Sequence, residues 1–268
     1  MQESRLVKID DLKKDSLDTS LLLQFPNPMK GSRGVCLATE DIPLQLLYSA
    51  YIQGVFPWFS EEDGEPVLWC SPSPRFCIRM ENLHIGRSID RFLKKSPYRY
   101  TMDKAFSRVI EECSRMKRRG QRGTWIGSKI IEAYNLFHEA GFAHSVEVWH
   151  GENLVGGFYG VLIGSVYCGE SMFTLESNSS KSAFALFARC FKDCGGLLID
   201  SQSYTDNIAR YGAENISRTA FLRLEGEALR LPLAKNLREQ FESAVSGYPV
   251  QNPRTGDVHT GSQDLRTF

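Results

Sequence analysis

The chain has 268 residues, of which 42% are apolar and 24% charged, and its 32 Lys and Arg balance its 32 Asp and Glu. This composition is that of an ordinary globular protein and excludes a largely disordered, fibrous or strongly basic chain. A polyanionic partner would therefore have to be recognised by a local patch of charge.

The first residues, MQESRLVKIDDLKKDS, contain no apolar stretch of the length that a secretion signal needs. No later segment approaches the roughly 18 uninterrupted apolar residues of a membrane span. We therefore expect a cytoplasmic protein. The seven cysteines are an odd number, without CxxC pairs or a His at zinc spacing, so we expect reduced thiols and no metal.

Residues 46–74, LLYSAYIQGVFPWFSEEDGEPVLWCSPSP, are rich in aromatic residues and proline. They cannot form one long helix, because Pro57, Pro66, Pro72 and Pro74 each disrupt helical geometry. The segment predicts a junction between a small N-terminal lobe, residues 1–75, and the main domain.

Residues 127–141, GSKIIEAYNLFHEAG, predict an amphipathic helix. Ser128 is a possible N-cap and Gly141 a stop signal. The apolar positions at near-helical spacing are Ile130, Ile131, Tyr134 and Phe137.

Residues 144–173 contain three short β-prone segments separated by HGEN and Gly164, which is typical of an antiparallel meander. A second helix follows, with Ala183, Leu186, Phe187, Cys190 and Phe191 in one apolar stripe, and then the apolar run LLID. This order predicts an α+β fold with a mixed sheet whose last crossover can be parallel. The residues from 238 onward are polar, and we expect a loosely held tail over 238–268.

Nine ordered motifs resemble the bacterial aminoacyl-tRNA-protein transferases of leucyl/phenylalanyl specificity. They are YIQGVFPWF (51–59), WCSPSPR (69–75), GTWI (123–126), AHSVEVW (143–149), LVGGFYGV (154–161), GESMF (169–173), SSK (179–181), IDSQ (199–202) and YGAENISR (211–218). The sequence departs from the usual family pattern at Cys70, Tyr167 and Asn207, where Trp, Phe and His are usual.

The resemblance implies a GNAT-like acyltransferase domain over residues 76–237 and no cofactor. It implies transfer of Leu, Phe or Met from aminoacyl-tRNA to proteins that begin with Arg or Lys, which marks them for N-end-rule degradation. An aminoacyl ester is already activated, and an α-amine with a pKa of about 8 is partly neutral near pH 7. Positioning and modest proton transfer can therefore carry the reaction without a covalent nucleophile.

By this resemblance Asp200 and Gln202 are the catalytic residues. Alternation along the strand is expected to place both on one side, with Asp200 polarising Gln202 and the Gln202 carbonyl holding the attacking amine. From position alone, a strand-end Asp and Gln more often satisfy loop amides.

Glu170 is expected at the acceptor's cationic N-terminal residue, and its neighbour Ser171 is a further candidate for substrate binding. Phe158, Tyr167, Met172 and Phe191 could line a pocket for the aminoacyl side chain, although such residues are more often plain core. Trp58 and Trp125 are candidates for stacking on the terminal adenosine, with structural packing as the alternative.

The segment CSRMKRRGQRG concentrates positive charge just before Trp125. Such a run is usually only a solvated loop, but its place beside GTWI favours contact with tRNA phosphates. The residues concerned are Arg115, Lys117, Arg118, Arg119 and Arg122.

Two other functions stay possible from the sequence. An acyl-CoA-dependent N-acetyltransferase would need an R/Q-x-x-G-x-G/A loop before the 179–181 motif, where none is present; RLEGEA at 223–228 fits the pattern but follows the last expected strand. A non-catalytic RNA-binding protein is the second alternative, and the presence of Asp200, Gln202 and Glu170 together argues against it.

Overall fold

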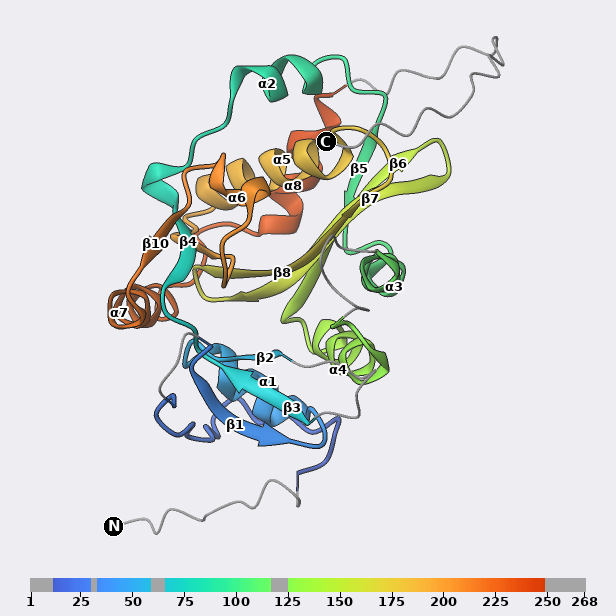
Figure 1. The fold of residues 1–268 in the computed structure, drawn as a ribbon. Helices are drawn as coiled ribbons and strands as arrows, with labels where there is room; N and C mark the ends of the chain where they lie inside the picture. The colour runs from blue at the N-terminus through green and yellow to red at the C-terminus, as the bar shows by residue number, and fades with distance from the viewer. Residues whose placement is uncertain (1–11, 30–32, 59–65, 117–124, 249–268) are drawn as a thin grey trace.

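The computed structural model describes residues 12–29, 33–58, 66–116 and 125–248 (Figure 1). Within these ranges a large mixed sheet carries helices on both faces, and a small sheet lies beneath one end of it (Figure 1). The expected mixed α/β architecture with a small N-terminal part is confirmed. No helix of the described ranges has the length and apolarity to cross a bilayer.

The small sheet has the order β1-β3-β2 and is antiparallel. Its strands are β1 (Val35–Thr39), β2 (Phe56–Trp58) and β3 (Val67–Cys70), and helix α1 (Leu44–Tyr51) joins β1 to β2. Pro57 lies in β2 because this is an edge strand, where a residue without an N–H does not break a ladder on both sides. The proline-rich run is therefore a helix and two strands, and not one helix, as expected.

The large sheet has the order β10-β4-β9-β8-β7-β6-β5. Strands β6, β7 and β8 form the expected antiparallel meander, and β9 pairs with β8 in parallel, also as expected. The strands are β4 (Arg75–Arg79), β5 (Arg99–Met102), β6 (Ala143–His150), β7 (Asn153–Ile163), β8 (Val166–Thr174), β9 (Leu198–Asp200) and β10 (Glu214–Ile216).

Helices cover both faces of the large sheet (Figure 1). On one face lie α2 (Arg87–Leu93), α5 (Ser179–Asp193) and α8 (Leu237–Ser246), and on the other α3 (Phe106–Arg115) and α4 (Ser128–Glu139). The short elements η3 (Met80–Asn82) and α6 (Asp206–Ala209) and the helix α7 (Arg218–Ala228) complete the order. Both predicted helices are confirmed as α4 and α5; Gly127 rather than Ser128 is the N-cap of α4.

Two hydrophobic clusters lie on opposite faces of the large sheet. One packs α5 and α8 against the sheet; the other joins α3 and α4 to the small sheet and α1. Because this second cluster contains Trp69 as well as Tyr134, the small sheet shares a core with the large one. The division at residues 75 and 237 stays a prediction.

The expectation of a loosely held segment from residue 238 is wrong for residues 238–246. These residues belong to α8, which packs against α5 and β5. Leu237 and Phe241, one helical turn apart, are 4% and 0% exposed, and the Asn236 side chain caps the helix by accepting the backbone N–H of Glu239. Leu237 and Phe241 are thus apolar residues at helical spacing in a mostly polar sequence, and they place one face of α8 in the core.

Candidate active site

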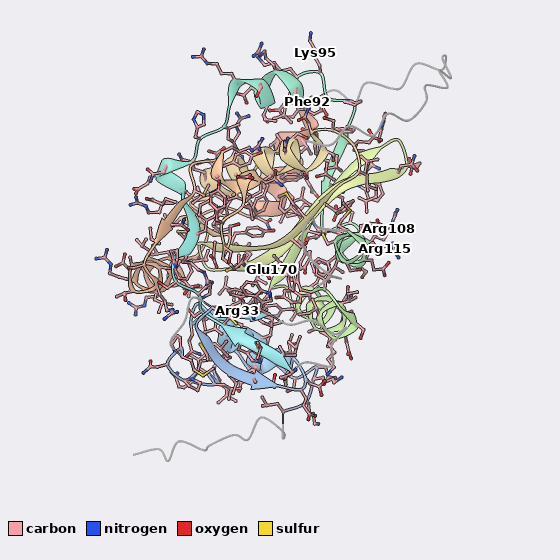
Figure 2. The ribbon with its side chains drawn as sticks, viewed as in Figure 1. Arg33, Phe92, Lys95, Arg108, Arg115 and Glu170 are labelled. Carbon is pink, nitrogen blue, oxygen red and sulfur yellow. The ribbon has the colours of Figure 1, made fainter. Side chains whose placement is uncertain are left out.

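Glu170 occupies a β-bulge in β8. Tyr159 of β7 pairs with Ser171, but the next residue, Gly160, pairs with Gly169, so Glu170 is the extra residue. The bulge reverses the alternation of the strand: Cys168 and Phe173 pack in the cluster with α3 and α4, whereas Tyr167 and Met172 belong to the cluster with α5. Glu170 lies between the large sheet and the small sheet (Figure 2).

Two tyrosines hold one side of the Glu170 carboxyl group. Tyr134 of α4 donates a hydrogen bond from its hydroxyl to Oε2 at 3.3 Å, and the hydroxyl of Tyr51, at the end of α1, makes a short hydrogen bond with that of Tyr134. Burial raises the pKa of Glu170 to about 7, against the opposing effect of the tyrosine hydrogen bonds. Near neutral pH the carboxyl group is therefore present in both protonation states.

Gln202 holds the other side of this carboxyl group. Its Nε2 donates to Oε1 of Glu170 at 3.1 Å. The residue lies beyond the end of β9 in the left-handed region, with φ 55°, and its backbone N–H donates to Oδ1 of Asp200 at 2.9 Å. The strand alternation expected to align Asp200 with Gln202 is therefore wrong, because the strand ends at Asp200; the Asp200 carboxylate meets the backbone of Gln202.

Asp200 forms a buried ion pair with Arg75 of β4. Nε and Nη2 of Arg75 donate to Oδ1 and Oδ2 of Asp200 at 2.8 and 2.6 Å. The side chains are 2% and 0% exposed. Such a bidentate pair fixes the orientation of the carboxylate as well as its charge.

The residues expected to line an aminoacyl pocket lie on the other face of the sheet. Phe158, Tyr167 and Phe191 are at most 2% exposed and pack in the cluster with α5, while Met172 is partly buried beside them. The buried Tyr167 hydroxyl has no hydrogen-bond partner among the described residues. Ser171, 8% exposed, follows Glu170 directly in the strand. The assignment of Phe158, Tyr167, Met172 and Phe191 to a pocket, and that of Ser171 to substrate binding, stay predictions.

The two tryptophans expected at the adenosine are partly buried, and both pack against the cluster that contains Tyr51 and Tyr134. Trp58 stacks on Phe56, with ring centroids 6.2 Å apart, and the Arg33 guanidinium lies 5.5 Å from the Trp58 ring centroid. They are thus on the same side of the sheet as Glu170. Their role in binding an adenosine stays a prediction.

The basic run lies largely outside the described residues, which include neither Lys117 nor Arg118, Arg119 or Arg122. Arg115, the last residue of α3, is on the outer side of that helix (Figure 2). It forms ion pairs with Glu112 at 2.6 Å and Glu111 at 3.4 Å. Part of its charge is thus already neutralised by its own helix.

Sequence reasoning missed three side chains of this network. Arg75 stands at the end of the WCSPSPR motif, and no local pattern links it to its partner, which is 125 residues away in the chain. Tyr134 fits the apolar stripe of α4, and Tyr51 lies in an aromatic run, so both read as core. Within the described residues no group of three or more His, Cys, Asp or Glu could hold a metal ion.

Comparisons with known proteins agree on one family. The family described as leucyl/phenylalanyl-tRNA protein transferase matches residues 77–225, and its N-terminal domain matches residues 40–73. A leucyl/phenylalanyl-tRNA–protein transferase of Myxococcus xanthus is 46% identical over 209 residues, which are 78% of this chain and 88% of that protein. Those of Shigella sonnei and Escherichia coli are 46% and 45% identical over 203 residues, which are 75% of this chain and 85% of theirs.

Solved structures show only a remote likeness. That of L-PGS from Bacillus licheniformis is 10% identical with a TM-score of 0.36 and covers 63% of this chain and 56% of its own. That of a GCN5-related N-acetyltransferase-like protein from Streptococcus suis is 14% identical with a TM-score of 0.31, covering 64% and 63%. The match over most of the sequence, by contrast, is close: the chain belongs to the leucyl/phenylalanyl-tRNA protein transferase family.

Proposed function

We propose that this protein transfers leucine, and also phenylalanine or methionine, from aminoacyl-tRNA to the N-terminal Arg or Lys of acceptor proteins. The product would be marked for degradation by the N-end rule, in the cytoplasm. The names of the 45% and 46% identical relatives support the donor and the type of reaction. The acceptor class rests on the resemblance and on the chemistry of Glu170.

The observation that carries the proposal is the hydrogen bond from Gln202 to Glu170. It places an amide, which can both donate and accept hydrogen bonds, beside a carboxyl group that can pair with a cationic side chain. An acceptor whose first side chain pairs with Glu170 would bring its α-amine close to the Gln202 carboxamide. Both groups come from adjacent strands, β8 and the end of β9, so the arrangement is held by the sheet.

In the proposed reaction the neutral α-amine attacks the ester carbonyl of the aminoacyl-tRNA. The peptide C–N bond forms, the bond from the carbonyl carbon to the ribose oxygen breaks, and the proton lost by the amine ends on that ribose oxygen. The Gln202 carbonyl holds the amine N–H during attack, and Asp200 holds the backbone of Gln202. Most of the rate enhancement would come from positioning, which can contribute about 7 to 11 kcal/mol.

The remaining assignments follow the same proposal. Trp58 and Trp125 would stack on the terminal adenosine, where each such contact contributes about 1 to 3 kcal/mol. Phe158, Tyr167, Met172 and Phe191 would bind the aminoacyl side chain after a rearrangement that opens their closed packing. Ser171 would contact a substrate beside Glu170. The basic run would contact tRNA phosphates; its members are Arg115, Lys117, Arg118, Arg119 and Arg122.

The test is incubation with labelled leucyl-tRNA and peptides that differ only in beginning with Arg, Lys or Ala. We expect transfer to the Arg and Lys peptides and little to the Ala peptide. Equal transfer to all three would contradict the acceptor class, and no transfer to any would contradict the reaction. Phenylalanyl-tRNA and methionyl-tRNA in place of leucyl-tRNA test the donor range.

A further inference from the structure

Arg75 makes contacts in three directions from a fully enclosed position. Besides its two hydrogen bonds to Asp200, Nη1 donates to the backbone carbonyl of Gly54 at 3.1 Å. The guanidinium also lies 4.3 Å from the ring centroid of Phe221 and 5.0 Å from that of Phe56. A planar, delocalised cation suits such a site, because it can stack on aromatic rings while its edge donates hydrogen bonds.

The contact with Asp200 extends to Gln202. Oδ1 of Asp200 accepts both from Nε of Arg75 and from the backbone N–H of Gln202, at 2.8 and 2.9 Å. Gln202 needs this second bond because its φ of 55° lies in a region that residues with a side chain rarely adopt. If the Asp200 carboxylate turned, the backbone N–H of Gln202 would lose its acceptor. The Gln202 side chain would then no longer be oriented to donate its hydrogen bond to Glu170.

The contacts with Gly54 and Phe56 extend to the small sheet. Gly54 ends the turn after α1, and Phe56 is in β2, where it stacks on Trp58. Arg75 thus touches, through one side chain, the loop that leads to Trp58 and the residue that holds Gln202. The Arg75 guanidinium therefore connects the strand that carries the proposed adenosine-binding Trp58 with the residues proposed to carry out the reaction.

Stability alone gives little reason for this pair. Burying two charges carries a desolvation cost, and well-packed apolar residues often serve folding as well or better. Burial also raises the pKa of nearby Glu225 well above its usual range. What a bidentate pair adds over apolar packing is a fixed direction for both partners.

We propose that Arg75 is a positioning residue for aminoacyl transfer. By fixing the Asp200 carboxylate it holds Gln202 against Glu170. Through Gly54 and Phe56 it also fixes the position of Gln202 relative to β2, the strand that carries Trp58. This inference rests on the proposed role of Gln202. Arg75 itself touches neither substrate; it acts through Asp200 and Gly54.

The experiment compares Arg75→Lys with Arg79→Lys as a matched control. Arg79 lies two residues further along β4 and makes a partly exposed ion pair with Glu214, at 2.7 Å. Lys keeps the charge but not the two-pronged geometry. We expect Arg75→Lys to lower the single-turnover transfer rate per folded molecule by about 10- to 100-fold, and Arg79→Lys to leave it unchanged.

A merely structural role would change the folded fraction and not the rate per folded molecule. The dissociation constant for leucyl-tRNA, measured by filter binding, should stay within about threefold for Arg75→Lys, so that the loss appears in the rate. Asp200→Asn should lose a similar factor, and the double variant should lose little more, because the two residues act as a unit. Additive losses, an unchanged rate or a loss confined to binding would each overturn the proposal.

A second readout does not depend on transfer. In protein labelled with 15N-glutamine, the backbone amide of Gln202 should shift and exchange faster with solvent in Arg75→Lys, and should be unchanged in Arg79→Lys. If the wild-type protein transferred no leucine, the proposed function would fail, while this measurement would still decide whether Arg75 holds Gln202. An unchanged Gln202 amide in Arg75→Lys would refute the positioning role.

Discussion

The side-chain amide of Gln202 donates a hydrogen bond to the carboxyl group of Glu170 at 3.1 Å, across two strands that pair in parallel. The residues are 32 positions apart in the chain. Parallel pairing brings β8 and the end of β9 together, and each residue then departs from regular strand geometry, Glu170 by a bulge and Gln202 by a left-handed backbone. Both departures aim a polar side chain at the same point.

Gln202→Ala should lower turnover far more than affinity for aminoacyl-tRNA. We expect a loss of about 100-fold or more in the single-turnover rate, because the carboxamide is assigned to the attacking amine and not to donor binding. Ser203→Ala, at the exposed neighbouring residue, is the control. Asp200→Ala should also lose turnover, but it leaves Arg75 buried without its partner and should destabilise the fold by about 3 to 5 kcal/mol. Near-normal turnover in both Gln202→Ala and Asp200→Ala would remove these residues from the mechanism.

Discrimination between acceptors should depend on pH through Glu170. Because burial raises the pKa of this carboxyl group to about 7, it becomes anionic only as pH rises through that value. The ratio of kcat/KM for an Arg peptide over an Ala peptide should therefore rise between about pH 6 and 8, and the α-amine titration cancels in that ratio. Glu170→Gln should give a low and flat ratio. A wild-type ratio that does not change with pH would separate Glu170 from acceptor recognition.

The same shift predicts a pH dependence of stability. A carboxyl group whose pKa is higher in the folded state retains a proton that the unfolded chain has lost, so its contribution falls as pH rises from 4.5 to about 7 and is level above that. Urea unfolding of the wild type and of Glu170→Gln over this range measures the difference. We expect the variant to gain stability relative to the wild type as pH rises. A constant difference would show that the folded-state pKa is ordinary.

The basic run should set the salt dependence of tRNA binding. If Arg118 and Arg119 each neutralise one phosphate, the Arg118→Ala/Arg119→Ala variant should bind leucyl-tRNA more weakly at low salt, with a logarithmic salt slope shallower by about 2. Arg223→Ala/Arg230→Ala removes two exposed arginines elsewhere and should leave the slope unchanged. The first variant should still use a donor that carries only the aminoacylated terminal adenosine. Equal losses on the whole tRNA and on this fragment would show that the segment shapes the active site instead.

Removing the side chain of Phe241 should destabilise the protein. Phe241 is fully buried in α8, so Phe241→Ala is expected to lower the free energy of unfolding by about 3 to 5 kcal/mol. Ser243→Ala, on the exposed side of the same helix, should stay within about 0.5 kcal/mol of the wild type. Denaturant titration measures both. Similar stabilities of the two variants would mean that α8 contributes little to the fold.

Much of the large sheet could be predicted from local patterns. The meander, α4, α5 and the parallel β9 all follow from apolar periodicity and glycine positions, which act within a few residues. The ion pair of Arg75 with Asp200 could not be predicted in this way, because it depends on β4 and β9 lying side by side. The sequence did not predict α8 because its two buried residues, Leu237 and Phe241, stand among polar ones, and Ala244 and Val245 are only partly buried beside them.

The sequence predicted which residues form the candidate site better than it predicted how they contact one another. Resemblance singled out Glu170, Asp200 and Gln202, which the structure brings together. It gave no sign that Asp200 would meet the backbone of Gln202, since that contact depends on where β9 ends. Nor could periodicity identify Tyr134 as a polar partner, because a tyrosine in an apolar stripe packs its ring in the core whatever its hydroxyl does.

The bulge in β8 makes the length of this strand as important as its composition. If every residue of β8 paired regularly with β7, without the bulge, the residues beyond Glu170 would exchange faces. Met172 would then point toward α3 and α4, and Phe173 toward α5. Deleting one residue at the bulge would leave Met172 and Phe173 on their present faces, but the extra position that Glu170 occupies would be lost. Loops such as the β6–β7 turn can drift in length during evolution, whereas this strand has to keep its count.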